Sequence, residues 1–221
     1  AGKGSCVATG KSGSWNSQFV GSPTVVHDSR MYWMWYNGGE VTTDASYPYK
    51  VIERIGGATS RDGVNWKPLN DGNPLLRLGP RGSADYRGMA HPYVLKVDDR
   101  FLMWYGAIDG RSGKDLGLAP GHVRVEQICL ASSRDGVHWK RENNGRPVMP
   151  LGKKGTVDSL QVTGMHILRI YRDGQTVFRM WYGAYNGAHR LAVAESPDGL
   201  RWTRVFGGRP IAGLRGGSQG Q

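Results

Sequence analysis

The stretch SRDGVNW at residues 60–66 recurs as SRDGVHW at 133–139 and as SPDGLRW at 196–202. Its Asp-Gly pair is typical of a tight turn, because these residues tolerate the left-handed backbone that such a turn needs. The leading serine can hydrogen-bond to the turn backbone, and the closing tryptophan can pack on a neighbouring sheet. The stretch therefore predicts a hairpin between two β-strands, formed three times in one chain.

The repeat extends well beyond these seven residues. A proline follows each closing tryptophan by eight residues, at Pro74, Pro147 and Pro210. An aromatic block precedes each copy, as MYWMWYNGG at 31–39, FLMWYGA at 101–107 and FRMWYGA at 178–184. The closing tryptophans lie 73 and 63 residues apart, so each unit is long enough for several strands.

Each unit has the pattern of four β-strands. In the first unit they are predicted in SPTVVHD at 22–28, MYWMWY at 31–36, VIERIGGATS at 51–60 and VNWKPL at 64–69. No window has apolar residues at helical spacing without glycine interruptions. We therefore predict an all-β fold, a β-propeller, as a single domain over residues 1–221 with three four-stranded blades at about 15–74, 84–147 and 157–210.

Composition agrees with short strands and many turns. The 221 residues include 34 glycines, and glycine costs about 1 kcal/mol relative to alanine at a position inside a helix. No apolar run reaches the roughly 18 residues of a transmembrane helix. We expect a soluble protein, and the sequence assigns it to no compartment, organellar and secreted locations included.

Cysteine content and charge leave some alternatives open. Cys6 and Cys129 are the only cysteines, and their number and spacing favour structural or free thiols over a metal site. No metal or cofactor is predicted, because no pair of histidines and a carboxylate has a metal-ligand spacing. The net charge of +11 fits either a basic solvated surface or an acidic partner such as nucleic acid, an anionic membrane or an acidic polysaccharide.

The number of blades is unusual, because propellers close with about four to eight. The sequence can be part of a longer chain, another chain can complete the ring, or the blades can form a short open arc. We favour the first explanation, because an open arc leaves strand edges unpaired.

Four segments of the first unit, with their copies in the other two, resemble a known superfamily. They are SWNSQFVGSPTVV at 14–26, MWYNGG at 34–39, IGGATSRDGVNW at 55–66 and NPLL at 73–76. The similarity is to the five-bladed propellers of the arabinanase, levansucrase and invertase superfamily, which are glycoside hydrolase families 32, 43 and 68 and uncharacterised relatives. It covers nearly the whole chain after residue 14. The resemblance implies that a glycan binds in a central funnel lined by acidic residues of the innermost strands.

Aligning the units on the aromatic block places Asn16, Asp85 and Asp158 at equivalent positions. The resemblance implies that Asp85 and Asp158 are catalytic, because a glycosidase needs one carboxyl group as acid and another as nucleophile or base. The alternative is that both hold the start of a blade through backbone contacts. Asn16 stands where the superfamily has an aspartate. No glutamate occupies the position of the general acid, since Glu53 and Glu126 begin third strands and Glu195 ends one.

Substrate contacts are expected from Asn16, Trp15, Trp33 and His91. Trp33 has no counterpart in the other units and Trp15 adjoins Asn16, so both are candidates for stacking on sugar rings. The recurring Trp35, Trp104 and Trp181 are predicted to pack between blades instead.

Two further groups of residues are weaker candidates. His166 and His189 are histidines of the third unit without a metal-ligand pattern. The insert at 108–127 is a polar loop of the kind that carries recognition, and it contains Arg111, Lys114, His122 and Arg124.

The function predicted first is that of a carbohydrate-binding, glycoside hydrolase-like propeller, catalytically impaired because Asn16 cannot act as a base. The alternative is a non-catalytic scaffold or binding subunit of a larger complex. The predicted partners are accordingly a glycan or other carbohydrate and protein subunits that complete or dock to the propeller, with nucleic acid ranked last.

Overall fold

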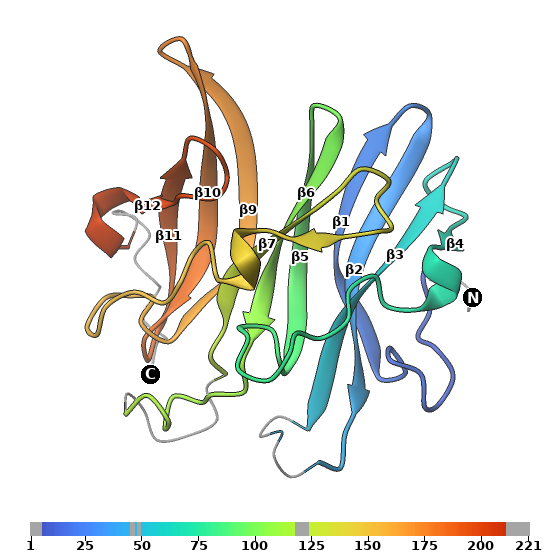
Figure 1. Ribbon diagram of the computed structural model, residues 1–221, viewed down its shortest axis with the longest axis horizontal. Coiled ribbons are helices and arrows are strands. Elements are labelled where there is room, and N and C mark those ends of the chain that lie inside the picture. Colours follow the sequence, from blue (N-terminus) through green and yellow to red (C-terminus); the bar gives the residue numbers. More distant parts are fainter. Residues whose placement is uncertain (1–5, 45–46, 48–49, 118–123, 211–221) are drawn as a thin grey trace, which may run out of the picture.

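The computed structural model of this protein describes residues 6–44, 47, 50–117 and 124–210. These residues form three antiparallel four-stranded sheets, in each of which the strands follow one another in chain order (Figure 1). The described residues contain no α-helix, and none of their helical segments is long or apolar enough to cross a membrane. The predicted all-β fold with three four-stranded propeller blades is confirmed.

The three sheets are built alike, and we refer to them as blades one, two and three. Blade one contains β1 (Phe19–Asp28), β2 (Met31–Val41), β3 (Val51–Ser60) and β4 (Lys67–Pro68). Blade two contains β5 (Gly88–Val97), β6 (Arg100–Ile108), β7 (Gln127–Ser133) and β8 (Lys140–Arg141). Blade three contains β9 (Gln161–Arg172), β10 (Gln175–Tyr185), β11 (His189–Ser196) and β12 (Thr203–Arg204). A short 3-10 turn follows each fourth strand, as η1 (Asn70–Gly72), η2 (Asn143–Gly145) and η3 (Val205–Gly208).

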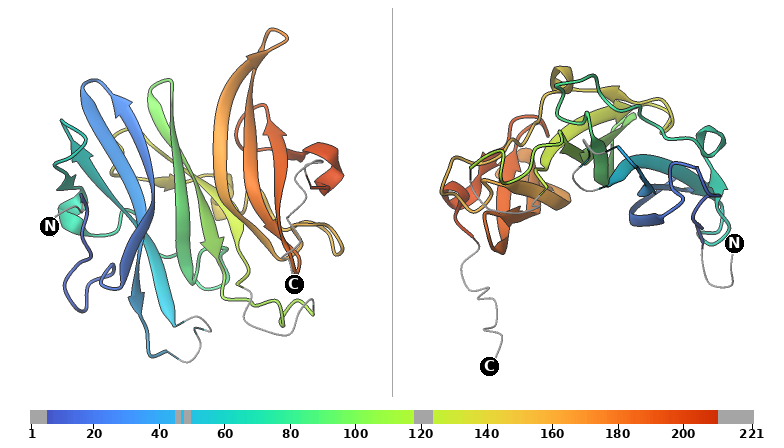
Figure 2. Two further views of the ribbon diagram at one scale, coloured as in Figure 1. Left: turned by 180° about the vertical axis from the view of Figure 1, so that it is seen from behind. Right: turned by 90° about the horizontal axis from the view of Figure 1, so that it is seen from below.

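The blades stand side by side in an arc, which is clear in the view from below (Figure 2). The first strands are neighbours along the arc, with β1 beside β5 and β5 beside β9. In all three blades the loop that precedes the first strand lies at the same end of the sheet (Figure 1). Residues near the starts of the first and third strands of different blades can therefore meet.

The repeated heptapeptide forms the connection between third and fourth strands, as predicted. Ser60 Oγ accepts the N–H of Gly63 at 2.9 Å, and Asp62 Oδ1 accepts the N–H groups of Val64 and Asn65 at 2.9 and 2.7 Å. Gly63 takes the left-handed φ of 74°, which only glycine adopts without strain. The same bonds recur around Ser133 and Ser196. The turn is held by hydrogen bonds between residues close in the chain, and its three copies make the same bonds.

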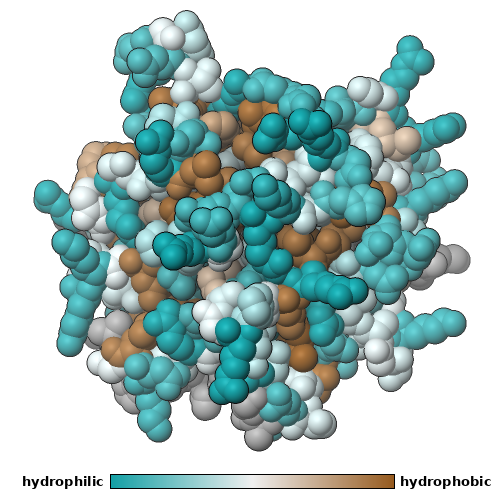
Figure 3. Space-filling model, in the orientation of Figure 1, coloured by the Kyte–Doolittle hydropathy of each residue, from teal (hydrophilic) through white to brown (hydrophobic). Residues whose placement is uncertain are grey.

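The hydrophobic core lies between blades. One cluster joins Trp35 and Ile55 of blade one to Phe101 and Met103 of blade two, and the second joins blade two to blade three in the same way. On the face drawn in Figure 3, hydrophilic side chains cover most of the surface and apolar side chains show in patches between them. Neither cysteine is in a disulfide, since Cys6 is exposed and Cys129 is buried in the first of these clusters.

Candidate functional site

A bulge interrupts the first strand of each blade at the same position. The residues there are Ser22, His91 and Gly164, with left-handed φ angles of 46°, 48° and 55°. Bulges of this kind redirect side chains and are common beside active sites. A histidine held in this conformation carries a small cost in backbone energy, and such strain concentrates at functional positions. The bulge places the His91 ring against residues that begin the third strand of the same blade.

His91 belongs to a cluster of polar side chains contributed by all three blades, which we call the carboxylate cluster. Its members are Asn37 and Glu53 of blade one, His91, Arg124 and Glu126 of blade two, and Thr163 of blade three. Glu126 lies at its centre with 1 % of its side chain exposed. The cluster exists because the starts of third strands lie beside the first strand of the next blade, as the bond from Val162 N–H to the Glu126 carbonyl at 2.9 Å shows.

Both carboxylate oxygens of each glutamate accept a hydrogen bond. His91 Nδ1 lies 2.9 Å from Glu126 Oε1, which also accepts the hydroxyl of Thr163, and Arg124 Nη2 donates to Glu126 Oε2 at 2.9 Å. The other arm of the Arg124 guanidinium donates to Glu53. A single arginine thus bridges two carboxylates from neighbouring blades.

Asn37 supplies the one buried side-chain atom of the cluster that lacks a hydrogen-bond partner among the described residues. Its Nδ2 donates to Glu53 Oε2 at 2.7 Å, whereas its Oδ1 is buried and has no hydrogen-bond partner among the described residues. A buried carbonyl oxygen without a donor costs roughly 1–3 kcal/mol, so such an atom usually receives a water or ligand hydroxyl. Glycine occupies the equivalent position in the other blades, at Gly106 and Gly183, so this amide is specific to blade one.

The charged groups of the cluster shift each other's pKa values. Burial alone would raise the pKa of Glu126, but the hydrogen bond from His91 and the charge of Arg124 lower it below its usual value. The bond to Glu126 raises the pKa of His91, against the opposing effect of burial. The arrangement favours an ionised glutamate beside a protonated imidazole. His91 Nε2 has no partner among the described residues, and the side chain is 32 % exposed, so this nitrogen is open to a ligand.

Asp85 and Asp158 lie apart from the cluster, each in its own repeated network. Asp85 has no exposed surface and accepts Tyr105 OH at 3.0 Å and Arg141 Nε at 2.7 Å. Asp158 is buried likewise and accepts Tyr182 OH at 2.9 Å and Arg204 Nε at 2.6 Å. The partners are side chains of the same blade, not the backbone N–H groups considered from sequence. Within the described residues, neither aspartate bonds to a member of the carboxylate cluster.

The equivalent place in blade one is neutral. Asn16 Oδ1 accepts the Ser14 hydroxyl at 3.2 Å, and the strand position that carries Arg141 and Arg204 in the other blades carries Pro68. A carboxylate at residue 16 would therefore lack the arginine that neutralises its two counterparts. In blade one, the amide of Asn16 thus occurs together with Pro68 in place of the arginine.

The two tryptophans considered as sugar platforms pack inside the protein. Trp15 is buried, donates its Nε1–H to the Gly72 carbonyl at 2.8 Å and stacks on Tyr36. Trp33 is half-buried between blades one and two, stacked on Trp35 with centroids 6.2 Å apart.

The weaker candidates are dispersed. Tyr93 OH lies 3.5 Å from His166 Nε2, and His189 begins β11 at the position equivalent to Glu53. Glu195 pairs with Arg179 at 2.7 Å, away from the cluster. Of the insert at 108–127, Arg124 enters the cluster, Arg111 pairs with Asp109, and His122 lies outside the described residues.

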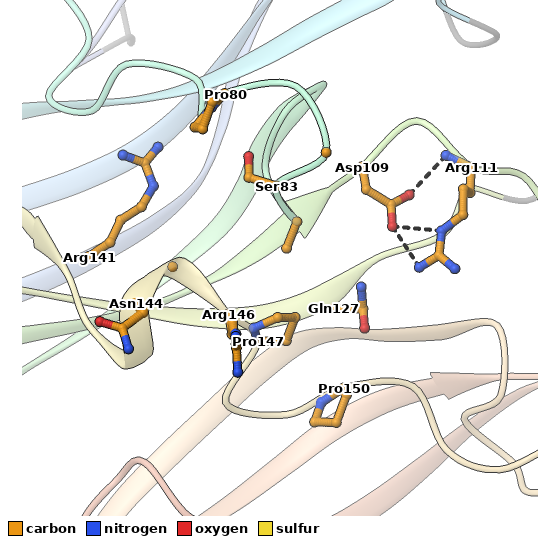
Figure 4. A pocket seen from close by; sticks show the side chains of 13 residues that line it. Pro80, Ser83, Asp109, Arg111, Gln127, Arg141, Asn144, Arg146, Pro147 and Pro150 are labelled. Atoms are coloured by element: carbon orange, nitrogen blue, oxygen red, sulfur yellow. Dashed lines mark hydrogen bonds and ion pairs between the residues drawn. The ribbon is translucent and has the colours of Figure 1, made fainter.

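A second polar region lies beside the start of β7. The pocket in Figure 4 has a volume of about 570 Å³, and its lining includes Asp109, Arg111, Gln127, Arg141 and Arg146. It lies against the loop that precedes β5, on the side of Gln127, next to Glu126 in the chain. The described residues contain no group of three or more side chains arranged to hold a metal ion.

The sequence indicated His91 as a candidate and placed Glu53 and Glu126 at the starts of third strands. Nothing in it indicated that the three side chains meet. The only available signal was that Glu53 and Glu126 both stand thirteen residues before a closing tryptophan. Asn37 and Thr163 carried no signal at all, because their roles depend on contacts between blades.

Comparison with known proteins finds relatives in sequence that are longer than this chain. No family model matches it. It is 27 % identical over 190 residues to an uncharacterised protein of Mycobacterium tuberculosis, covering 84 % of this chain and 54 % of that protein. It is 24 % identical over 204 residues to a 1,2-β-oligomannan phosphorylase of Thermoanaerobacter, covering 89 % and 62 %. The chain therefore spans only about half to three-fifths of the length of these two relatives.

The comparison with solved structures concerns the fold. A family 117 glycoside hydrolase of Zobellia galactanivorans superposes with a TM-score of 0.64 at 17 % identity, over 84 % of this chain and 55 % of that one. Similarity at this level of identity concerns the fold. The chain thus has the fold of the glycoside hydrolase-like β-propeller superfamily, as the sequence resemblance implied.

Proposed function

We propose that the carboxylate cluster is the centre of a glycan-processing site, in which His91 exchanges a proton with the glycosidic oxygen. The supporting observation is the His91–Glu126 pair, because Nδ1 is anchored on a buried carboxylate while Nε2 is open to a ligand. A histidine oriented in this way is a general acid or base at neutral pH. The names of relatives, which include phosphorylases of β-1,2-linked mannans, support a carbohydrate substrate.

The remaining cluster residues have distinct roles in this proposal. Glu126 and Thr163 orient His91 and favour its protonated form. Glu53 and Asn37 bind sugar hydroxyls, since the Asn37 Oδ1 atom needs a donor and a hydroxyl supplies one. Arg124 pairs with both glutamates, and its charge lowers the pKa of Glu126. Glu126 therefore does not hold the proton that the leaving group requires, and the imidazole remains to supply it.

We further propose that Asp85 and Asp158 are positioning residues and do not touch the glycan. Their complete burial and their bonds to Arg141 and Arg204 support this assignment. Asn16, Trp15 and Trp33 then have packing roles and do not contact the sugar.

A second candidate function is glycan binding without catalysis, in a scaffold or a larger complex. The observation that favours it is the Arg124 bridge, because a carboxylate held by a guanidinium is a poor nucleophile unless the ligand displaces the arginine.

The experiment offers β-1,2-linked mannobiose and mannotriose to the protein, with and without inorganic phosphate. Binding is followed by calorimetry and products by chromatography. We expect free mannose from hydrolysis or mannose 1-phosphate from phosphorolysis, and we expect His91→Gln to abolish turnover while binding changes only a few-fold. Binding without turnover by the unsubstituted protein selects the second candidate.

The matched control is Asp173→Asn, which removes an exposed carboxylate on the β9–β10 turn whose side chain is 91 % exposed. It should leave both readouts unchanged. Absence of binding to mannosides and to a panel of other oligosaccharides would contradict a glycan site.

A further inference from the structure

The pocket of Figure 4 is a second cavity, and none of the carboxylate cluster residues lines it. We call it the β7 pocket. Its polar lining includes Asp109, Arg111, Gln127, Arg141 and Arg146, which come from the end of β6, the start of β7, the end of β8 and the segment after η2. The volume of about 570 Å³ falls in the range of small-molecule sites, which is roughly 300–1,000 Å³.

Gln127 separates this pocket from the carboxylate cluster. It begins β7 and directly follows Glu126, and successive side chains of an extended strand point to opposite faces. Glu126 therefore lies against His91, whereas Gln127 lines the β7 pocket (Figure 4). The Gln127 Oε1 atom accepts the Leu151 N–H at 3.4 Å, and the Nε2 atom has no partner among the described residues.

The lining has one cation without a counter-ion. Arg111 Nε donates to Asp109 at 2.8 Å, and Arg141 Nε donates to the buried Asp85 at 2.7 Å, so two of the three arginines are paired. The third, Arg146, makes no side-chain hydrogen bond or ion pair with any residue that the structure describes. The β7 pocket thus favours a negatively charged ligand.

The polar groups that face this cation are donors. Both oxygens of Asp109 are already in use, since Oδ1 accepts the backbone N–H of Arg111 and Oδ2 accepts its Nε–H. The guanidinium of Arg146 and the amide nitrogen of Gln127 remain, and both donate without accepting. The Asn144 side chain points away from them (Figure 4). A ligand here must bring acceptor oxygens.

The rest of the wall is largely apolar. Pro80, Pro147 and Pro150 line the β7 pocket together with Ala84. Small-molecule sites combine such apolar walls with a few well-placed polar groups. An inorganic ion would leave the proline rings without a partner, whereas a compact organic ring would cover them.

We propose that the β7 pocket binds a small organic anion. Arg146 and Gln127 hold its carboxylate or phosphate group, and its ring lies against the three prolines. The two groups share the required chemistry, because each presents several acceptor oxygens to a guanidinium. This inference is independent of the glycan proposal, since none of these residues belongs to the carboxylate cluster.

The test measures the binding of mannose 6-phosphate, glucuronate, inorganic phosphate and mannose by isothermal titration calorimetry. We expect mannose 6-phosphate or glucuronate to bind at least about tenfold more tightly than inorganic phosphate and mannose, because only these two have both a charged group and a ring. The tighter of the two identifies the anionic group.

Two substitutions test the donors. Arg146→Gln should weaken this binding at least about tenfold, because hydrogen bonds from a charged donor are the strong ones. Gln127→Glu should also weaken it, because the change keeps an oxygen for the Leu151 N–H and replaces the free donor with a carboxylate.

The matched control is Arg134→Gln, which removes an arginine outside the β7 pocket whose side chain is 80 % exposed. It should change the affinity by less than about twofold, because salt screens an exposed and distant charge. His91→Gln should leave the affinity unchanged, and urea unfolding should show that all four variants are folded.

Three results would overturn the proposal. Equal losses of affinity for Arg146→Gln and Arg134→Gln would assign binding to the overall positive charge. Weaker binding by His91→Gln would assign it to the carboxylate cluster. The third result is that neither organic anion binds more tightly than inorganic phosphate and mannose.

Discussion

Arg141 Nε lies 2.7 Å from the Asp85 carboxylate, and the pair is conserved between blades as Arg204 and Asp158 at 2.6 Å. In each case the other guanidinium arm donates to a backbone carbonyl of the preceding linker, that of Arg77 or Pro150. The ion pair therefore ties the fourth strand of a blade to the loop before its first strand. The contact is present in blades two and three, and blade one has Asn16 and Pro68 at the equivalent positions.

Removing one member of this ion pair should destabilise the folded protein. We expect Asp85→Ala to lower the free energy of unfolding by about 3 kcal/mol, because it leaves a partly buried arginine without its counter-ion. The double variant D85A/R141L should lose less than the sum of the two single changes. Urea unfolding measures all three, and Asp173→Ala, at an exposed pair, should change stability by less than about 0.5 kcal/mol. An unchanged urea midpoint for Asp85→Ala would contradict a stabilising role for the ion pair of Asp85 and Arg141.

The His91–Glu126 pair predicts a dependence of stability on pH. The pKa of His91 is raised in the folded protein, mainly by its hydrogen bond to Glu126. The pair therefore contributes its full stability below the unfolded pKa of about 6.5, and the contribution is lost as pH rises through the folded pKa. Urea unfolding at several pH values should show this loss, and His91→Gln should remove it. NMR titration of the imidazole gives the direct check, since Glu126→Gln should lower the pKa of His91.

A glycine beside the cluster allows its geometry to be tested without altering a charge. A Cβ atom at Gly106 would lie 1.9 Å from Glu126 Oε1, so Gly106→Ala must displace that carboxylate. At the equivalent Gly183, the nearest atom to such a Cβ is the Thr163 carbonyl oxygen at 3.2 Å. We expect Gly106→Ala to reduce glycan affinity at least about tenfold and Gly183→Ala to have a smaller effect. Equal effects of the two substitutions would argue against a site at Glu126.

The Trp104 indole of blade two donates to the Gly199 carbonyl of blade three at 2.9 Å, and this contact between blades predicts unequal roles for the equivalent Trp104 and Trp181. Trp104→Phe removes the bond to the Gly199 carbonyl and should cost about 1 kcal/mol in the 221-residue chain. Trp181→Phe should cost almost nothing in that chain, because its indole has no corresponding acceptor among the residues that the structure describes. Urea unfolding monitored by circular dichroism distinguishes them, and a larger loss for Trp181 would contradict the assignment.

The two thiols should differ sharply in reactivity. Burial raises the pKa of Cys129 to about 12, with the nearby Asp85 carboxylate acting in the same direction, whereas Cys6 is exposed. We expect one equivalent of maleimide to react within minutes at pH 7 and the second only after unfolding. Mass spectrometry of the labelled peptides identifies the sites, and rapid labelling of Cys129 would show that the core between blades one and two opens.

The amino-acid sequence by itself determined the hairpins, the strands and the three blades that this chain contains. These features rest on residues close in the chain, as in the bonds from Ser60 to Gly63 and from Asp62 to Asn65. Because each such turn is local, three copies of a heptapeptide specify three copies of the structure. The positions of Asp85 and Asp158 at equivalent places followed from the same spacing.

Only the tertiary structure decided which polar residues meet. Arg141 is 56 residues from Asp85, and Arg124 is 71 residues from Glu53, so neither pairing has a local signature. Their contacts follow from the way in which the start of one blade's third strand lies beside the first strand of the next. The packing of sheets around an arc, which no single repeat encodes, placed His91 on Glu126 and left Leu191 of blade three 51 % exposed.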